Sequence, residues 1–162
     1  MRTISYYNIR RCTKSYRGGI MSNLPNENLR IINALTSEID PMYHEAARRL
    51  GITDSEMNVL YMTYDSGGKR PLADITATGL SKQTINSALR KLEGKGYIYL
   101  EGKRQKTVCL TESGNEFAES TVGKIISIEN RIFGSWTKEE VDTYIALNKR
   151  FIDAFKEMTE EL

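Results

Sequence analysis

One stretch of the chain carries polar side chains whose types and spacing suit contact with the edges of nucleic-acid bases. Between Ser81 and Glu93 the apolar residues recur at intervals of three and four, which predicts a helix with Ser81 as its N-cap. Its apolar face consists of Ile85, Ala88, Leu89 and Leu92, and its outer side presents Lys82, Gln83, Thr84, Asn86, Ser87, Arg90 and Lys91. Gln and Asn can each form two hydrogen bonds with adenine, and Arg can do the same with guanine. Any solvated helix has a polar outer face, so the interpretation depends on the lack of acids before Glu93 and on the basic residues that come after the helix.

A basic hairpin comes directly after this helix. Gly94 and Gly96 end the helix, and residues 97–101 and 106–110 then alternate as two short strands around the tip 102–105. Residues 79–108 hold seven basic and two acidic side chains, a local excess that would attract an anionic duplex. We therefore interpret residues 76–114 as a winged helix-turn-helix. The residues expected to contact double-stranded DNA are Lys82, Gln83, Thr84, Asn86, Ser87, Arg90, Lys103, Arg104 and Lys106.

The same region resembles the multiple-antibiotic-resistance regulator (MarR) family of bacterial transcription factors. The likeness rests on the pattern L-S-x-x-T-I-N-x-A-L-x-x-L-E-x-x-G-Y-I at residues 80–98 and on L-T-x-x-G at residues 110–114, with the basic wing between them. It implies a homodimer with one winged helix-turn-helix in each subunit and a wing arginine at Arg104. Two positions depart from the family pattern. Gly102 stands where an Asp is usual, which leaves Glu101 as the candidate brace, and Thr78 stands where a bulky apolar residue is usual.

Helical patterns flank this module on both sides. One apolar stripe runs from 26 to 50 and stays in phase through Pro41, which favours a single kinked helix. Thr53 and Glu56 form a capping box for a helix to Tyr64, and Ser66-Gly67-Gly68 then makes a turn. A further helix is expected from Thr111 to about Gly134, and a second capping box at Thr137 opens the last one. The expected fold is mainly α with a small β-wing (α+β): a winged helix-turn-helix at about 53–111, flanked by dimerisation helices at about 26–50 and 112–162.

The dimer is expected because the flanking helices carry more apolar surface than one small core can cover. The last helix alone presents Val141, Tyr144, Ile145, Phe151, Ile152, Phe155 and Met158. Unused apolar stripes of this kind are typical of an interface between copies. The alternative is that these helices fold back on their own core.

Residues 1–24 differ in composition from the expected MarR-like domain at 25–162. The first twenty hold five basic residues and no acid, which leaves 18 basic and 21 acidic residues in the rest of the chain. Three readings stay open: a basic arm that follows phosphates, a targeting segment, or a stretch upstream of a natural start at Met21, which we favour.

Composition and missing motifs narrow the functional class. The 162 residues have ordinary apolar (40%) and charged (27%) fractions for one soluble domain. Cys12 and Cys109 are too few for a disulfide framework, and His44 is the only histidine, so a His-rich metal site cannot form. No nucleophile elbow, phosphate loop or dinucleotide fingerprint is present. We expect a cytoplasmic protein with no enzymatic activity, catalytic residue, cofactor, metal site or membrane segment.

The function predicted from the sequence is a sequence-specific DNA-binding transcription regulator, a homodimeric repressor on a pseudo-palindromic operator. The family resemblance implies release by a small aromatic or phenolic effector bound between the dimer helices and the DNA-reading head. Residues expected to line that pocket are Tyr43, His44, Tyr61 and Tyr64. The alternative is a winged-helix module that binds protein instead of DNA, and a steep dependence of affinity on salt would favour DNA.

Overall fold

The computed structural model describes residues 24–160 and 162. The expectations for the basic extension, for Met21 and for Cys12 fall at residues 1–23, outside the described residues. The chain divides between Ile39 and Asp40 into two compact units, and each is described by itself. Within the described residues, no helix has both the length and the hydropathy that a membrane span requires.

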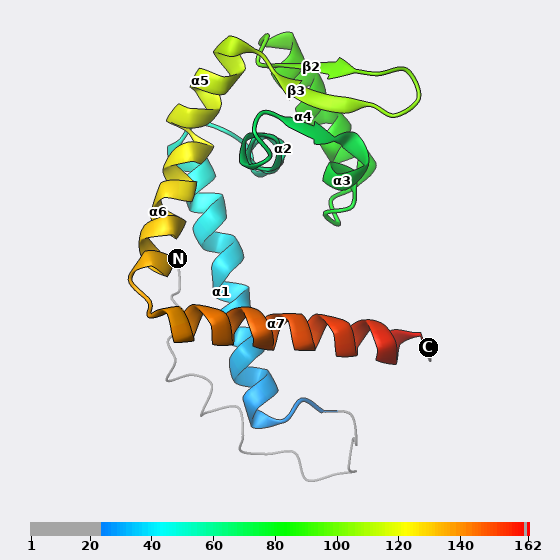
Figure 1. Ribbon diagram of the computed structural model, residues 1–162. Helices are drawn as coiled ribbons and strands as arrows, with labels where there is room; N and C mark the ends of the chain where they lie inside the picture. The colour runs from blue at the N-terminus through cyan, green and yellow to red at the C-terminus, as the bar shows by residue number, and fades with distance from the viewer. Residues whose placement is uncertain (1–23, 161) are drawn as a thin grey trace. The chain divides into compact units, whose positions relative to one another are not determined.

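The expected fold class is confirmed: the chain is mainly helical and has one small antiparallel sheet (Figure 1). The elements follow in the order α1 (Glu27–Arg49), α2 (Asp54–Asp65), β1 (Lys69–Pro71), α3 (Leu72–Thr76), α4 (Lys82–Gly94), β2 (Ile98–Glu101), β3 (Thr107–Leu110), α5 (Glu112–Ser120), α6 (Val122–Gly134) and α7 (Lys138–Thr159). Helix α1 runs through Pro41 without a break, as the phase of its apolar stripe predicted.

The reading head is built around a core between α2, α4 and the sheet. The apolar stripe of α4 is buried, and α2 contributes Val59 and Leu60, which are also fully buried. Ile75 of the short helix α3 fills the same core. Each buried aliphatic side chain of this size stabilises the fold by roughly 1.5–3 kcal/mol relative to an exposed one. The core therefore fixes the position of α4 and leaves its polar side free.

The sheet has three strands in the order β1-β3-β2, with antiparallel neighbours throughout. The two wing strands were predicted, and β2 pairs with β3 so that Ile98 lies opposite Leu110. Strand β1 was not predicted, because Lys69-Arg70-Pro71 is short and polar and is held as a strand by its pairing with β3. The predicted turn before it is confirmed: Gly67 and Gly68 both have positive φ angles.

The single helix predicted from Thr111 to Gly134 is wrong, because the chain breaks at Thr121 into α5 and α6. Thr121 has φ −116° and ψ −88°, and its backbone N–H donates to the carbonyl of Ala118. Its buried hydroxyl donates to the carbonyl of Phe117 at 2.7 Å. A hydroxyl that bonds the preceding turn competes with helical hydrogen bonding, and the apolar spacing does not register this local event.

The apolar face expected on the last helix is present on α7 but is not buried within the chain. Tyr144, Ile145, Phe151 and Phe155 are between 46% and 65% exposed, and no residue of α7 is fully buried. In the first unit, Leu29, Ile32 and Leu35 on α1 are likewise exposed. Both predicted capping boxes are confirmed, at Thr53 for α2 and at Thr137 for α7.

Candidate nucleic-acid interface

Helix α4 presents its polar side to solvent. Gln83, Asn86, Ser87, Arg90 and Lys91 line one shallow surface hollow, and all five are exposed. Lys82 and Thr84 are also exposed, so every residue on this helix that was predicted to contact DNA is accessible. Among the described residues, no side chain of the five that line the hollow forms an ion pair or a side-chain hydrogen bond with another residue. These amides and cations are therefore free to bind an external partner.

The N-terminus of α4 is closed by its own side chains. The Ser81 hydroxyl oxygen accepts a hydrogen bond from the Thr84 backbone N–H at 3.0 Å, as the sequence predicted. The two hydroxyl groups of Ser81 and Thr84 also lie 2.7 Å apart. Thr84 thus has part of its hydrogen-bonding capacity engaged in the cap, unlike Gln83 and Asn86. The first turn contains no acid, so the positive end of the helix dipole is not neutralised there.

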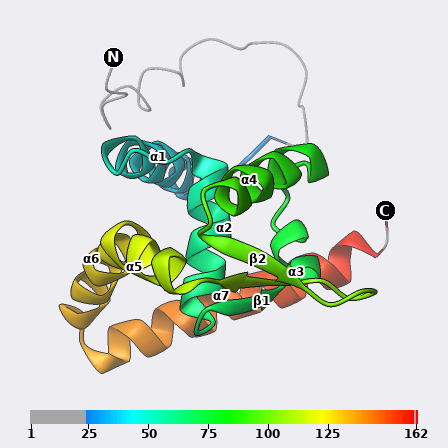
Figure 2. The same cartoon turned by 90° about the horizontal axis from the view of Figure 1, so that it is seen from above.

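The wing places three basic side chains at an exposed tip. Lys103, Arg104 and Lys106 lie in or beside the loop between β2 and β3, and all are exposed. Figures 1 and 2 show this loop extending beyond α3 and α4. Gly102 has φ +92°, and an added Cβ would overlap the carbonyl oxygen of Gln105. The tight turn therefore requires glycine at the position where the family usually has Asp.

Glu101 does contact another element of the sheet, although its partner is not Arg104. Its Oε2 accepts from Lys69 Nζ at 3.2 Å, which connects β2 to β1, and the Cys109 Sγ lies 3.6 Å from the same oxygen. The bond from Lys69 lowers the pKa of the exposed Glu101 carboxyl. Cys109 is fully buried in β3, where it packs as a small strand residue.

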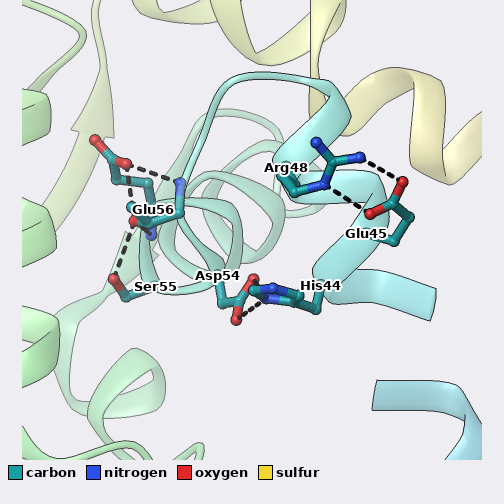
Figure 3. Close-up of polar contacts among 7 residues, drawn as sticks. His44, Glu45, Arg48, Asp54, Ser55 and Glu56 are labelled. Atoms are coloured by element: carbon teal, nitrogen blue, oxygen red, sulfur yellow. Dashed lines mark hydrogen bonds and ion pairs between the residues drawn. The ribbon is translucent and has the colours of Figure 1, made fainter. Parts of the chain in front are cut away.

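A buried carboxylate holds the far end of α4. Glu56 of α2 is only 3% exposed and accepts from the Thr53 backbone N–H and hydroxyl at 2.9 and 2.8 Å. Its other oxygen accepts from Lys95 Nζ at 3.2 Å, at the residue directly after α4. Figure 3 shows Glu56 at the start of its helix. Sequence analysis identified the capping box but not the bond to Lys95, because that partner lies 39 residues away.

A second site lies at the opposite side of α2 from this reading head. A cavity of about 690 Å³ is lined by Asp40, Tyr43, His44, Asp54, Met57, Asn58, Tyr61, Met62, Thr78, Gly79, Leu80 and Glu129. Three of the four residues predicted for an effector pocket are therefore together. The prediction for Tyr64 is wrong for this cavity, because its ring lies against Gly123 of α6 and lines a separate hollow.

Glu129 of α6 is the central polar group of this cavity and was not predicted. Its two oxygens accept hydrogen bonds from the hydroxyls of Tyr43 and Tyr61, the latter at 2.5 Å. Burial and the bond to Glu129 raise the pKa of Tyr43 to about 12 and also raise that of Tyr61. His44 faces Asp54, with its Nδ1 2.8 Å from Oδ2 (Figure 3), as its expected role as a hydrogen-bonded helix residue required.

Comparison with known proteins agrees with this architecture. Residues 50–105 match the model of the MarR family. A MarR family regulator from Neisseria meningitidis is 20% identical, with a TM-score of 0.71 over 84% of this chain and 99% of that one. The S. aureus MepR–DNA complex is 21% identical, with a TM-score of 0.58 over 78% of this chain and 96% of that one. A MarR/EmrR family regulator from Acinetobacter is 23% identical, with a TM-score of 0.62 over 79% and 94%. No curated protein sequence matched.

Proposed function

We propose that this chain, which belongs to the MarR family, is a sequence-specific regulator of transcription that binds double-stranded DNA. The observation that carries the proposal is the exposed side of α4, where amide, hydroxyl and guanidinium groups are held in place by a buried apolar face and lack carboxylate partners among the described residues. Side chains of these types read base edges in the major groove. The basic wing tip supplies contacts to phosphates or to the minor groove beside it.

The regulator acts as a homodimer on a pseudo-palindromic operator. The apolar faces of α1 and α7 are each exposed in the single chain, and a second copy would cover them. In a twofold dimer the two α4 helices enter successive major grooves, about 34–36 Å apart. A dimer bound across a promoter would block transcription, so we assign the protein as a repressor in the cytoplasm. A small aromatic effector in the cavity of Tyr43, His44 and Tyr61 would release it.

The DNA assignment is tested with duplexes selected from a random-sequence pool by the full chain. Gln83→Ala and Asn86→Ala should each lose about 1–3 kcal/mol of binding free energy on the selected duplex and lose discrimination at particular base pairs. Lys103→Ala should weaken binding to selected and scrambled duplexes alike, and it should lower the slope of log affinity against log salt by about 0.9 for each phosphate that the variant no longer binds. Lys124→Ala, which removes a lysine from α6, away from α4 and the wing, is the matched control.

Two results would contradict the assignment. One is equal loss of affinity by the α4 variants on selected and scrambled duplexes, which would remove base reading by this helix. The other is a failure to select any duplex together with a shallow salt dependence, which would favour the alternative of a winged-helix module that binds protein. The Lys124 control must keep the salt slope of the unmodified chain for the Lys103 result to be meaningful.

A further inference from the structure

The charge of the effector cavity is as distinctive as its shape. Its lining includes the carboxylates of Asp40, Asp54 and Glu129, and no lysine or arginine from the described part of the chain lies among the lining residues. His44 is the one imidazole of the lining, and it is paired with Asp54. A monoanionic ligand would meet repulsion from three carboxylates at close range, while a cation would be attracted.

The remaining walls suit an organic cation with an apolar body. Tyr43 and Tyr61 contribute two half-buried aromatic rings, and Met57, Met62 and Leu80 contribute apolar surface. A cation over an aromatic face is attracted by the ring quadrupole, and methionine adapts to irregular ligands. The volume of about 690 Å³ falls within the range of pockets for small organic molecules.

Two polar groups are positioned to recognise the charge. Glu129 is half-buried and has no basic partner among the described residues; its two oxygens are held by the tyrosine hydroxyls. The side-chain oxygen of Asn58, in the same lining, is buried and has no hydrogen-bond partner within the residues described. Both groups are acceptors that a cationic or N–H-bearing ligand would satisfy, and a carboxylate or phenolate ligand would not.

We propose that this cavity binds lipophilic organic cations, with Glu129 as their counter-ion, in place of the phenolic effectors that the family resemblance implies. The regulatory meaning of this binding rests on the proposed function, whereas the binding itself does not. A cation at Glu129 competes with the tyrosine hydroxyls for the carboxylate. Because Tyr61 belongs to α2, which packs against α4, the competition acts directly on a helix that supports the DNA-reading surface.

The test uses tetraphenylphosphonium and tetraphenylborate, two ions of similar shape and opposite charge, titrated calorimetrically into the full chain without DNA. The phosphonium should bind and the borate should not. Glu129→Gln, which keeps the size of the side chain, should weaken phosphonium binding about 10- to 100-fold, the range expected for loss of a charged partner. Tyr61→Phe keeps the ring but frees one carboxylate oxygen, and should strengthen binding.

Opposite effects of these two variants distinguish a counter-ion from a residue that only supports the fold. Glu116→Gln, an exposed carboxylate on α5, is the matched control and should change nothing. Equal binding of both ions, or unchanged phosphonium affinity in Glu129→Gln, would overturn the proposal. If Glu129→Gln does not fold, the comparison of the two ions on the unmodified chain still decides the sign of the charge. Binding of the phosphonium by a chain that selects no duplex would refute the DNA function and leave the cation site standing.

Discussion

The two capping boxes of this chain offer a matched measurement of what the buried carboxylate of Glu56 contributes. Glu56 at the start of α2 and Glu140 at the start of α7 each accept from the N–H of their N-cap threonine, at 2.9 and 2.8 Å. Only Glu56 is buried, and of the two only Glu56 has a cationic partner among the described residues, Lys95. Substitution of each glutamate by alanine therefore removes the same local motif from two different environments.

The expected loss can be estimated from the contacts. Removal of a capping interaction costs about 0.5–2 kcal/mol. Glu56→Ala also empties a buried site of its side-chain methylene, at about 0.8 kcal/mol. The Lys95 side chain is 48% exposed, so solvent limits that ion pair to about 0–1 kcal/mol. The total for Glu56→Ala is about 2–4 kcal/mol, against about 0.5–1 kcal/mol for Glu140→Ala. Glu56→Gln can keep the box, since glutamine also serves at this position, and should lose about 1 kcal/mol.

Urea unfolding at one fixed protein concentration measures these differences, since a dimer's stability depends on concentration. Burial by itself raises the pKa of Glu56, but the bonds from Thr53 and Lys95 outweigh it and hold the pKa below its usual value. The folded state therefore favours the carboxylate. The stabilisation should be complete above the unfolded pKa of about 4.3 and should disappear as the pH falls through the folded value.

Equal losses for Glu56→Ala and Glu140→Ala would refute the reasoning, because burial and Lys95 would then contribute nothing. A stability difference between the unmodified chain and Glu56→Gln that grows below pH ~4 would refute the sign of the pKa argument. The Lys95→Met variant separates the two contributions: it removes the cation and keeps the capping box, and it should lose no more than about 1 kcal/mol.

Two further predictions concern the dimer and the cavity. Ile145→Asp or Phe151→Asp places a charge on the exposed apolar face of α7, which should cost several kcal/mol in a dimer interface, so light scattering at micromolar concentration should report monomer or aggregate; normal dimers from both variants would place the interface elsewhere. Tyr43, with its pKa raised to about 12, should lose its proton later than an ordinary tyrosine, so stability that is complete below a pH of about 10 should fall as the pH rises towards 12. Phenolate absorbance follows this step, and Glu129→Gln should shift it to lower pH; no shift would exclude Glu129 as a cause.

The elements predicted correctly are those whose signals are local. Helix α4 has its cap, its apolar stripe and its glycine end within one short segment, and the hairpin has strict alternation around a basic tip. Strand β1 and the break at Thr121 were missed for a common reason. Each depends on a competition that spacing does not encode: a short polar segment gains a strand partner at β3, and a threonine hydroxyl takes a carbonyl from the preceding turn.

The cavity shows why a site can be predicted only in part. Tyr43 and Tyr61 attract attention in the sequence because each combines an aromatic ring with a polar hydroxyl, but Glu129 is one of many acids scattered over helix surfaces. Its role arises because α6 brings it to tyrosines that precede it by 86 and 68 residues. Sequence patterns report which face of a helix is apolar, and they do not report which polar group on another helix will meet its edge. The charge of the site, and with it the class of ligand, is therefore a property of the tertiary structure, and a resemblance based on the DNA-reading segment does not predict it.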